Sequence, residues 1–450
     1  MNVGREFLEA KAAEDDIEFF FAMFVDMHGK PCAKLVPASA MDVLMEGAGF
    51  AGFAAGPMWQ TPADPDMIAV PDASSYVKVP WRAGLAVVMC DIAVDGQLWP
   101  YTPRVILGRQ LARLAEQGLS LKVGVEAEYF LVRRAPGGGI TVADPQDTAD
   151  FPCYDAKGLY RMYNHLSTAS RYMNQLGYGN YANDHEDANG QFEQNFVYDD
   201  AMVTADRTIF FRYMVHLLAH EAGMAATFMA KPFANLTGNG LHTNISLWEG
   251  DKPLFEAPSG DSRGLGLSPL AYQFLGGLMA HAPGFAAVTC PTVNSYKRIG
   301  VAAPNSGATW APAYVAYGGN NRSQMFRVSD GTRVECRVVD GSANPYLAFT
   351  ALAAAGMDGV ARQLDPGEPN LENLFTLDPA EIARRGIVAM PPTLLHAAEN
   401  LVGDPVMREA LGSGPNGDYV DYFAQTKTEE FRAWHSKVSD WEVERYLTLM

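Results

Sequence analysis

The sequence has few cysteines and no long apolar run, and both absences restrict what the protein can be. Its 5 cysteines are an odd number, scattered over 450 residues. They predict neither a disulfide framework nor a zinc finger, and they suit a reducing compartment. No apolar stretch reaches the roughly 18 residues of a membrane-spanning helix, and residues 1–16 are too acidic for a signal peptide. We therefore expect a soluble, cytoplasmic protein.

Basic residues are also scarce. Lys and Arg together number 34 against 52 Asp and Glu, for a net charge of -18. This balance argues against binding nucleic acid or another polyanion, and the sequence contains neither a nucleic-acid-binding motif nor an internal repeat. Against this background, five arginines within 40 residues suggest an anionic ligand such as a phosphate. They are Arg298, Arg322, Arg327, Arg333 and Arg337.

The length predicts two domains, because a single hydrophobic core stops growing at about 250 to 300 residues. The segment WPYTPR interrupts a strand-rich region, and a helix-like stretch, RVILGRQLARLAEQG, follows it. We place the boundary there, between a domain of residues 1–103 and a larger domain of residues 104–450.

The segment Leu121 to Val132, LKVGVEAEYFLV, has the alternation of a β-strand. Glu126 and Glu128 share one face, and apolar residues occupy the other. Two carboxylates this close repel each other in a low-dielectric site unless a cation lies between them or water surrounds them. The segment therefore predicts either a metal site or the solvated face of an antiparallel sheet.

Three further segments place polar residues in a similar way. Residues 332–340 alternate Arg333, Glu335 and Arg337 with apolar residues, as in a metal and anion site or a surface strand with ion pairs. Residues 238–248 align His242, Asn244 and Ser246 behind a glycine-rich entry, although a lone histidine is more often structural. Residues 183–196 carry Glu186 and Glu193 around a glycine turn. If these residues converge, a site dominated by carboxylates favours Mg²⁺ or Mn²⁺.

Several of these runs, in this order, resemble the glutamine synthetase family. The resemblance extends over nearly the whole chain and is carried by KPFANLTGNGLHTNISLW, NSYKR, NNRSQMFRV and VECRVVDGSANPYLAFTALAAAG. It implies an α+β fold, with a β-grasp-like N-terminal domain and a larger catalytic domain built on a curved antiparallel sheet with helices. It also implies a homo-oligomer of stacked hexameric rings, a dodecamer, with active sites between neighbouring subunits.

The resemblance assigns a role to each candidate site residue. Two or more divalent cations would be held, the substrate-side one by Glu128, Glu186 and Glu193 and the ATP-side one by Glu126, His242 and Glu335. The glutamate substrate would contact Gly238, Arg298 and Arg337. The nucleotide and its phosphates would contact Asn244, Ser246, Arg322, Arg327 and Arg333. Arg322 and Arg337 would also act in catalysis.

The family's reaction, and hence the one expected here, activates a carboxylate. ATP phosphorylates the γ-carboxyl of L-glutamate, and an amine then displaces phosphate from the γ-glutamyl phosphate. Most of the catalysis should come from positioning and from stabilising oxygens that gain charge. We therefore expect an ATP-dependent carboxylate–amine ligase, and we expect loss of Arg322 to slow chemistry more than binding.

Two departures from the family pattern concern the amine. Glutamine synthetases carry an Asp in an N-terminal loop and a Glu in a flap, and both help to bind and deprotonate ammonium. The corresponding stretches, residues 49–59 and 307–312, place Ala51 and Trp310 there. Burying the methyl group of an alkylamine against apolar residues stabilises binding by only about 0.8 kcal/mol. Replacing the two acids also removes their attraction for a small bare cation such as ammonium. The pattern resembles the methylamine-using branch of the family, which makes N5-methyl-L-glutamine.

With the usual acids absent, another group must deprotonate the amine. Asp66 is our candidate, with the leaving phosphate as an alternative. Trp310 and Phe53 could cradle the cation through their ring faces, although Trp310 would equally suit simple packing. Residues 301–307, between two candidate arginines, are expected to form a mobile lid.

Three alternatives to a glutamate–methylamine ligase remain open at the level of sequence. A glutamine synthetase would use ammonia. A γ-glutamyl-polyamine ligase would need acidic residues for the distal charge of its substrate. A structural relative without activity would not need the complete set of metal and arginine positions.

Overall fold

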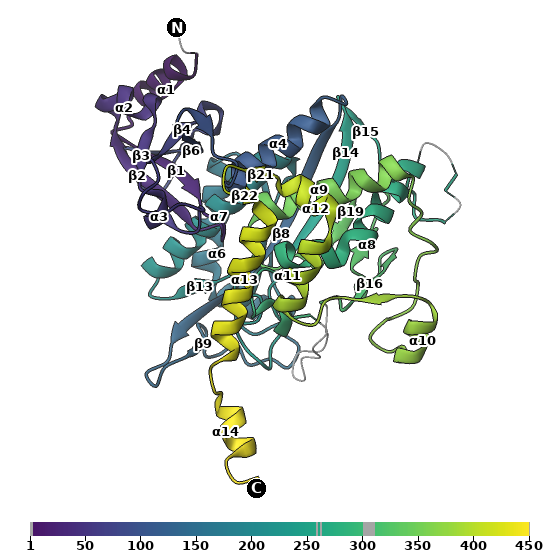
Figure 1. The fold of residues 1–450 in the computed structure, drawn as a ribbon. Coiled ribbons are helices and arrows are strands. Elements are labelled where there is room, and N and C mark those ends of the chain that lie inside the picture. Colours follow the sequence, from purple (N-terminus) through teal and green to yellow (C-terminus); the bar gives the residue numbers. More distant parts are fainter. Residues whose placement is uncertain (1–2, 258–259, 262, 300–310, 450) are drawn as a thin grey trace.

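Two β-sheets organise the chain in the computed structural model, which describes residues 3–257, 260–261, 263–299 and 311–449 (Figure 1). The N-terminal sheet contains seven strands and the second sheet contains eleven among these residues. The expectation of an α+β fold is confirmed. The lid expected at residues 301–307 and the residue Trp310 lie outside the described residues.

The N-terminal sheet has the order β2-β1-β6-β4-β3, with β5 and β7 paired to β6. Its central strand, LAVVMCDIAV, is apolar along most of its length because it is buried on both sides. Strands β1 and β6 are parallel and their other neighbours antiparallel, which is compatible with the β-grasp expectation. The elements are α1 (Val3–Glu14), β1 (Phe19–Val25), β2 (Pro31–Pro37), α2 (Met41–Glu46), β3 (Ala48–Phe50), α3 (Gly52–Ala55), β4 (Met67–Pro71), β5 (Val77–Lys78), β6 (Leu85–Val94) and β7 (Gln97–Leu98).

The helix expected after WPYTPR is present as α4 (Pro103–Ala115). Thr102 has extended backbone angles, and Pro103 occupies the first turn, where its missing N–H costs no hydrogen bond. The helix packs against the first long strand of the second sheet. The chain therefore passes from one sheet to the other at this helix.

The second sheet has the order β10-β11-β8-β14-β19-β18-β17 and is antiparallel except for the pair β17–β18 within the described residues. Strands β9, β12 and β13 pair with β8, and β15 pairs with β14. The strands are β8 (Ser120–Arg134), β9 (Ile140–Val142), β10 (Asn180–His185), β11 (Gln191–Phe196), β12 (Asp199–Asp200), β13 (Ala225–Thr227), β14 (Leu241–Glu249), β15 (Lys252–Pro253), β17 (Tyr317–Gly318), β18 (Phe326–Arg327) and β19 (Val334–Cys336).

Helices bury one face of this sheet. Val123, Val125 and Ala127 of β8 are at most 2% exposed and belong to one hydrophobic core with residues of α7 and α9. The helices after α4 are α5 (Ala156–Arg161), α6 (Tyr163–Gln175), α7 (Ala201–Glu221), α8 (Pro269–Thr289), α9 (Pro345–Arg362), α10 (Pro379–Arg384), α11 (Leu394–Gly403), α12 (Pro405–Leu411), α13 (Tyr419–His435) and α14 (Asp440–Tyr446). Two small antiparallel pairs join β16 (Tyr314–Val315) to β20 (Val388–Ala389) and β21 (Ser413–Gly414) to β22 (Gly417–Asp418). The opposite face of β8 is left for the polar residues of the site.

The strand expected over residues 332–340 is only partly correct. Strand β19 covers Val334–Cys336, after which the Arg337 N–H donates to the Met325 carbonyl and Asp340 forms an isolated bridge to Gly240. After Cys336, backbone hydrogen bonds to both sides continue, but the regular pairing with β14 and β18 ends there.

The C-terminal helix α14 projects from the body of the molecule (Figure 1), and none of its residues is buried. Among the described residues, no helix combines the length and apolar character needed to cross a bilayer.

Candidate active site

Strand register arranges the polar residues of the second sheet in rows. Across β8 and β14, Lys122 lies opposite Ser246, and Glu126 lies opposite His242. Directly opposed residues of an antiparallel pair point to the same face. Because side chains alternate along a strand, Lys122, Glu126 and Glu128 of β8 all face this side. The shared face predicted for Glu126 and Glu128, and the one predicted for His242, Asn244 and Ser246, are confirmed.

The same register extends the acidic row across two more strands. Glu128 of β8 lies opposite Glu193 of β11, and Glu193 lies opposite Asp184 of β10. On the other side of β14, Asn244 lies opposite Glu335 of β19. Residues separated by more than 200 positions thus meet on one face of one sheet.

His242 stands between two groups of carboxylates. Its Nδ1 lies 3.4 Å from Glu126 Oε2 and 3.8 Å from Glu335 Oε1, while its Nε2 lies 3.5 Å from Glu128 Oε1. The candidate ligand atoms of Glu126, His242 and Glu335 lie within 4.8 Å of one another, as do those of Glu128, Glu193 and His242. Five of the six predicted metal-binding residues therefore fall into two adjoining groups.

Glu186, the sixth, follows the end of β10 and lines the same cavity. Its carboxylate accepts a hydrogen bond from the Asp187 N–H at 3.0 Å. It does not join either of the two tight groups in the described structure.

Burial makes this cluster of acids unfavourable by itself. Burial raises the pKa of Glu128, Glu186 and Glu193, with repulsion from neighbouring carboxylates acting in the same direction, and the pKa of Glu186 rises to about 8. Burial and the nearby Arg337 lower the pKa of His242, so the imidazole is neutral and available as a ligand. A divalent cation would relieve the repulsion, and the oxygen-rich donor set fits Mg²⁺ or Mn²⁺. The residues present therefore fit the predicted metals.

Arginines line the same cavity, which has a volume of about 240 Å³. Arg337 Nη1 donates to Glu335 Oε1 at 2.6 Å, and Arg327 donates to the other oxygen of that carboxylate. Arg298 is almost fully buried and donates to the carbonyls of Val338 and Arg337 at 3.0 and 3.1 Å. Arg322 is the fourth cationic residue of the lining.

Gly238 also lines this cavity, and its lack of a side chain has a steric reason. A Cβ atom there would collide with the carbonyl oxygen of Ala230 and come within 3.0 Å of Arg298 Cγ. Glycine at this position lets the backbone approach Arg298 closely.

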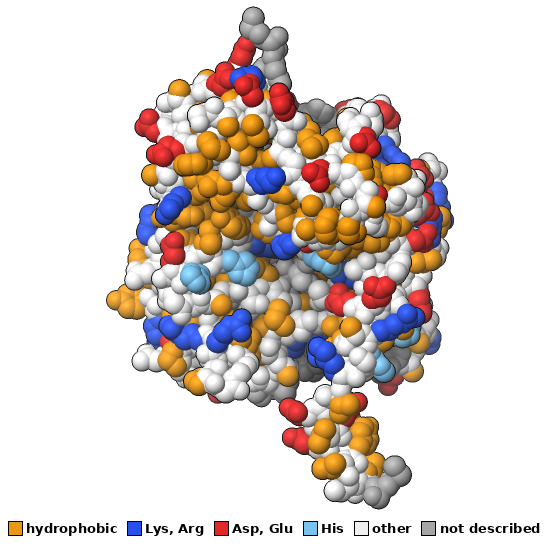
Figure 2. Space-filling view, turned by 60° about the vertical axis from the view of Figure 1, so that its left-hand side comes forward, with side chains coloured by type: hydrophobic (Ala, Val, Ile, Leu, Met, Phe, Trp, Pro, Cys, Tyr) orange, Lys and Arg blue, Asp and Glu red, His pale blue; other side chains and the backbone are white. Residues whose placement is uncertain are grey.

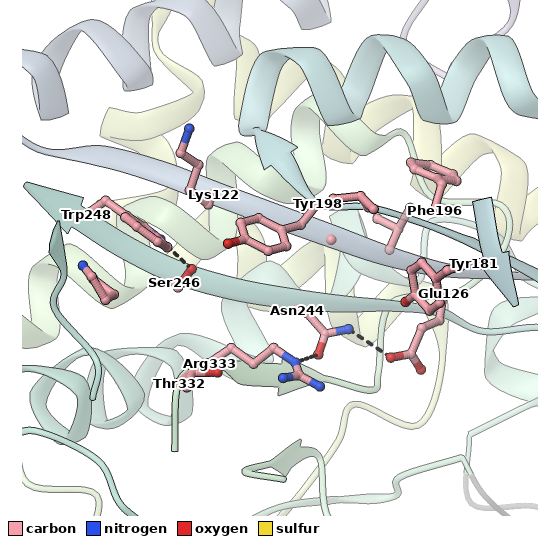
Figure 3. A pocket seen from close by; sticks show the side chains of 14 residues that line it. Lys122, Glu126, Tyr181, Phe196, Tyr198, Asn244, Ser246, Trp248, Thr332 and Arg333 are labelled. Atoms are coloured by element: carbon pink, nitrogen blue, oxygen red, sulfur yellow. Dashed lines mark hydrogen bonds between the residues drawn. The ribbon is translucent and has the colours of Figure 1, made fainter. Parts of the chain in front are cut away.

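A second cavity of about 500 Å³ adjoins the first at Glu126, which lines both. Figure 3 shows Asn244 between Glu126 and Arg333, donating to Glu126 Oε1 at 3.0 Å and accepting from Arg333 Nε at 2.9 Å. Lys122, Ser246 and Trp248 lie farther along the same strands, and Trp248 Nε1 donates to Ser246 Oγ at 2.9 Å. Arg333 thus belongs to this cavity and not to the one with the other arginines.

The second cavity has aromatic walls that the sequence interpretation did not include. Tyr198 and Trp248 have ring centroids 6.5 Å apart, and Tyr181 also lines the space (Figure 3). Aromatic rings line this cavity together with Arg333 and Lys122, so it offers surfaces on which a base can stack and cationic groups for phosphates.

Two predicted residues are not brought to these cavities by the described chain. Asp66 is exposed in the segment before β4, and Phe53 on α3 is 51% exposed. Neither is among the residues that line the two cavities.

Five residues of the first cavity were missed by the sequence interpretation, namely Cys153, Tyr154, Asp184, Thr237 and Ala311. Asp184 carried a signal, because it is two residues before Glu186 and alternates with it. Cys153 and Tyr154 come from a loop without periodicity, and Tyr154 has a positive φ of 63° that no pattern would reveal. The Tyr154 N–H donates to the His185 carbonyl at 2.9 Å, which fixes this loop beside β10.

Comparisons with known proteins agree with this geometry. Residues 100–446 match the model of the glutamine synthetase catalytic domain. The glutamate–methylamine ligase of Methyloversatilis universalis is 45% identical over 96% of this chain and 97% of its own length. Glutamine synthetases of Rhizobium leguminosarum bv. phaseoli and Pyrococcus abyssi are 42% and 35% identical over 97% and 95% of this chain and 98% and 96% of their own lengths.

Solved structures agree as well. A GmaS complex with ADP superposes with a TM-score of 0.91 at 45% identity, over 98% of this chain and 99% of that one. GmaS without ligand gives a TM-score of 0.88 at 43% identity, with the same coverage of both chains. The resemblance noted in the sequence is therefore confirmed, and the chain belongs to the glutamine synthetase family of ligases.

Proposed function

We propose that this ligase joins the γ-carboxyl of L-glutamate to methylamine at the expense of ATP, giving N5-methyl-L-glutamine, ADP and phosphate. The observation that carries the proposal is the pair of cavities that meet at Glu126, because one suits a nucleotide and the other an anionic substrate. The similarity to a glutamate–methylamine ligase over almost the whole of both chains supports the choice of amine.

Ligases of this family use ATP and a divalent metal, and the two groups around His242 are our candidates for two Mg²⁺ or Mn²⁺ sites. Glu126, His242 and Glu335 would hold the cation on the ATP side, and Glu128, Glu186 and Glu193 the one on the substrate side. When bound, the cations would neutralise charge on the phosphate and carboxylate oxygens. The protein contributes the fixed positions of these donors.

The arginines provide the remaining positive charge. Arg298 and Arg337 would bind the glutamate. Gly238, which has no side chain, would leave room for the backbone beside Arg298. Arg322 and Arg327, which line the first cavity, would contact the transferred phosphoryl group. Guanidinium groups held in place stabilise oxygens that gain charge, without reorganising during the reaction. Asn244, Ser246 and Arg333 would contact the nucleotide.

The amine would bind near Cys153, Tyr154 and Asp184 at the end of the acidic row. The Asp184 carboxylate makes no side-chain hydrogen bond or ion pair among the described residues, and it would be available to the cationic amine. The Tyr154 ring and the Cys153 side chain offer apolar surface for a methyl group. Asp66 remains a candidate base only if it reaches the site of a neighbouring subunit, and Trp310 remains a candidate amine contact.

The assembly we propose is a homo-oligomer of stacked hexameric rings. Figure 2 shows apolar side chains gathered on the face formed by the N-terminal part of the molecule, and more on the projecting C-terminal helix. Phe53 in the N-terminal part is 51% exposed, and Trp441 and Leu447 near the C-terminus are 63% and 77% exposed. Apolar surface of this extent supports burial against other copies of the chain. We also propose the domain division at residue 103 and a cytoplasmic location.

Glutamine synthetase activity is the second candidate, because several relatives that align over nearly their full length carry that name. The two functions are separated by measuring phosphate release with glutamate, Mg²⁺ and ATP while the amine is varied among ammonia, methylamine, ethylamine and putrescine. Our proposal predicts the highest kcat/KM with methylamine. A higher value with ammonia would assign the chain to glutamine synthesis, and a higher value with putrescine to polyamine ligation.

A further inference from the structure

Helix α13 touches three separate parts of the molecule through residues along its length. Tyr422 stacks on Trp59 of the N-terminal part, with ring centroids 4.7 Å apart and planes 6° from parallel. One turn farther, Lys427 Nζ lies 3.3 Å from Nδ1 of His28, in the turn between β1 and β2. Glu430 then contacts the segment of residues 291–298. A single helix thus bridges the N-terminal sheet and the segment that ends at Arg298.

The contact with residues 291–298 is made twice. Glu430 Oε1 accepts a hydrogen bond from the Val293 N–H at 3.2 Å. One helical turn later, the Lys297 ammonium lies 5.5 Å from the centre of the Trp434 ring. Glu430 and Trp434 are four residues apart on the helix, and their partners Val293 and Lys297 are four residues apart on the segment. The helix therefore fixes the direction of the segment as well as its position.

Lys427 orients Glu430. Its side chain is only 1% exposed, and its ammonium donates to Glu430 Oε2 at 3.1 Å while Oε1 binds Val293. Burial lowers the pKa of Lys427, and Glu430 and Asp26 oppose that shift. Removing Glu430 would take this carboxylate from the buried Lys427 ammonium, which is unfavourable for a charge out of contact with water.

The segment held by α13 carries Arg298 into the active site. Ser295 is fully buried, and its side chain and that of Thr292 each accept a hydrogen bond from the other's backbone N–H. The Arg298 N–H donates to the Ser295 carbonyl at 3.0 Å. The guanidinium then reaches the cavity beside Gly238. A tight turn thus connects Val293, which Glu430 contacts, to the residue that carries the guanidinium.

We propose that Lys427 and Glu430 are positioning residues for glutamate binding, acting through the segment 291–298 on Arg298. Neither lines the active-site cavity. They border a separate cavity of about 250 Å³ between the β1–β2 turn, the end of α8, the start of α9 and α13. The inference rests on the proposed role of Arg298 in binding glutamate.

The test uses the full-length enzyme and steady-state kinetics with each substrate varied in turn. Glu430→Ala and Lys427→Met are expected to raise the KM for glutamate about ten-fold, as loss of a hydrogen bond to a charged group does. The kcat and the KM for ATP should stay within about two-fold of the parent values. Glu429→Ala is the matched control, since the exposed Glu429 carboxylate accepts a hydrogen bond from Gln425 of the same helix and makes no hydrogen bond or ion pair with residues 291–298 among the described residues.

Two further variants separate positioning from a general structural role. Lys427→Arg keeps the charge and should recover most of the glutamate affinity. In an Arg298→Lys background, Glu430→Ala should add little further effect, because the residue through which it acts has already been changed. Equal rises in the KM for ATP and glutamate, an unchanged KM for glutamate, or full additivity with Arg298→Lys would each overturn the inference.

The outcome for Arg298→Lys alone distinguishes the two proposals. If it leaves the KM for glutamate unchanged, the assignment of Arg298 in the proposed function is wrong and the inference fails with it. If it raises that KM while Glu430→Ala does not, only the inference fails. Thermal unfolding of each variant would show whether enough folded enzyme is present, and Glu430→Gln supplies a milder change if Glu430→Ala does not fold.

Discussion

Glu126 and His242 lie directly opposite each other on β8 and β14, with the carboxylate Oε2 3.4 Å from the imidazole Nδ1. Because Nε2 of the same ring lies 3.5 Å from Glu128, one neutral histidine serves both groups of carboxylates. Two cations held around it would be neighbours, and the strand register would set their separation. The nucleotide and the substrate would meet at the same place.

Glu335→Ala should weaken divalent-metal binding by more than about 100-fold. Loss of a residue that only hydrogen-bonds to a metal ligand already lowers metal affinity about 10- to 100-fold, and loss of a ligand itself should cost more. The change also leaves Arg327 and Arg337 without their shared carboxylate. Mn²⁺ titration followed by electron paramagnetic resonance would measure the effect. Asp330→Ala, which removes an exposed carboxylate from Arg333, is the control. Unchanged Mn²⁺ affinity in Glu335→Ala would remove this residue from the metal site.

Arg322→Ala should lower kcat by about 100- to 1,000-fold, the usual cost of losing one fixed donor to a charge that develops in the transition state. The KM values for ATP and glutamate should change much less. Arg263→Ala removes an arginine that pairs with Asp365 away from the cavity and should leave kcat intact. A rise in KM at constant kcat would mean that Arg322 serves binding alone.

Trp248→Ala should raise the KM for ATP and leave the KM for glutamate unchanged. The Trp248 ring lies at the end of the second cavity that is remote from Glu126 (Figure 3). Loss of an aromatic contact costs about 0.5 to 1.5 kcal/mol, or roughly three- to ten-fold in affinity. Binding of ADP by calorimetry would check the assignment without turnover. Equal loss of glutamate and ADP affinity would contradict a separate nucleotide cavity.

His165 should make the fold sensitive to acid. Its ring is buried on α6 with no hydrogen-bond partner among the described residues, and burial lowers its pKa from 6.5 to about 4. The unfolded chain therefore binds more protons than the folded one between these values. Stability should fall as pH drops from 6.5 towards 4, by about 2 kcal/mol between pH 7 and pH 5.

Urea unfolding of the parent and of His165→Leu at both pH values would measure this contribution. The substitution should reduce the loss of stability by that amount, because leucine has no proton to bind. An identical pH dependence in the two proteins would show that His165 is not protonated on unfolding in this range.

The sequence revealed the faces of the strands better than their partners. Glu126 and Glu128, or His242 and Asn244, could be placed on one face because alternation is a local property. Asp184 extends the row of acidic residues because β10 lies beside β11, where it faces Glu193. Which strands become neighbours is set by the packing of the whole chain. The extent of β19 was misjudged for the same reason, since alternation continues past Cys336 whereas regular pairing with β14 and β18 does not.

Residues from loops were the hardest to foresee. Cys153 and Tyr154 reach the cavity through a turn with a positive φ at Tyr154, and no periodicity precedes it. Arg333 was counted with four other arginines because all five fall within 40 residues of the sequence. Its guanidinium bonds to Asn244 and lines the second cavity, whereas the other four line the first.

The central claim is that the two cavities transfer a phosphoryl group from ATP to the γ-carboxyl before the amine attacks. Glutamate labelled with ¹⁸O in that carboxyl, turned over with ATP, Mg²⁺ and methylamine, tests this directly by mass spectrometry of the released phosphate. The account predicts one ¹⁸O atom in each phosphate, because the acyl phosphate leaves with a carboxyl oxygen. Unlabelled phosphate would contradict it.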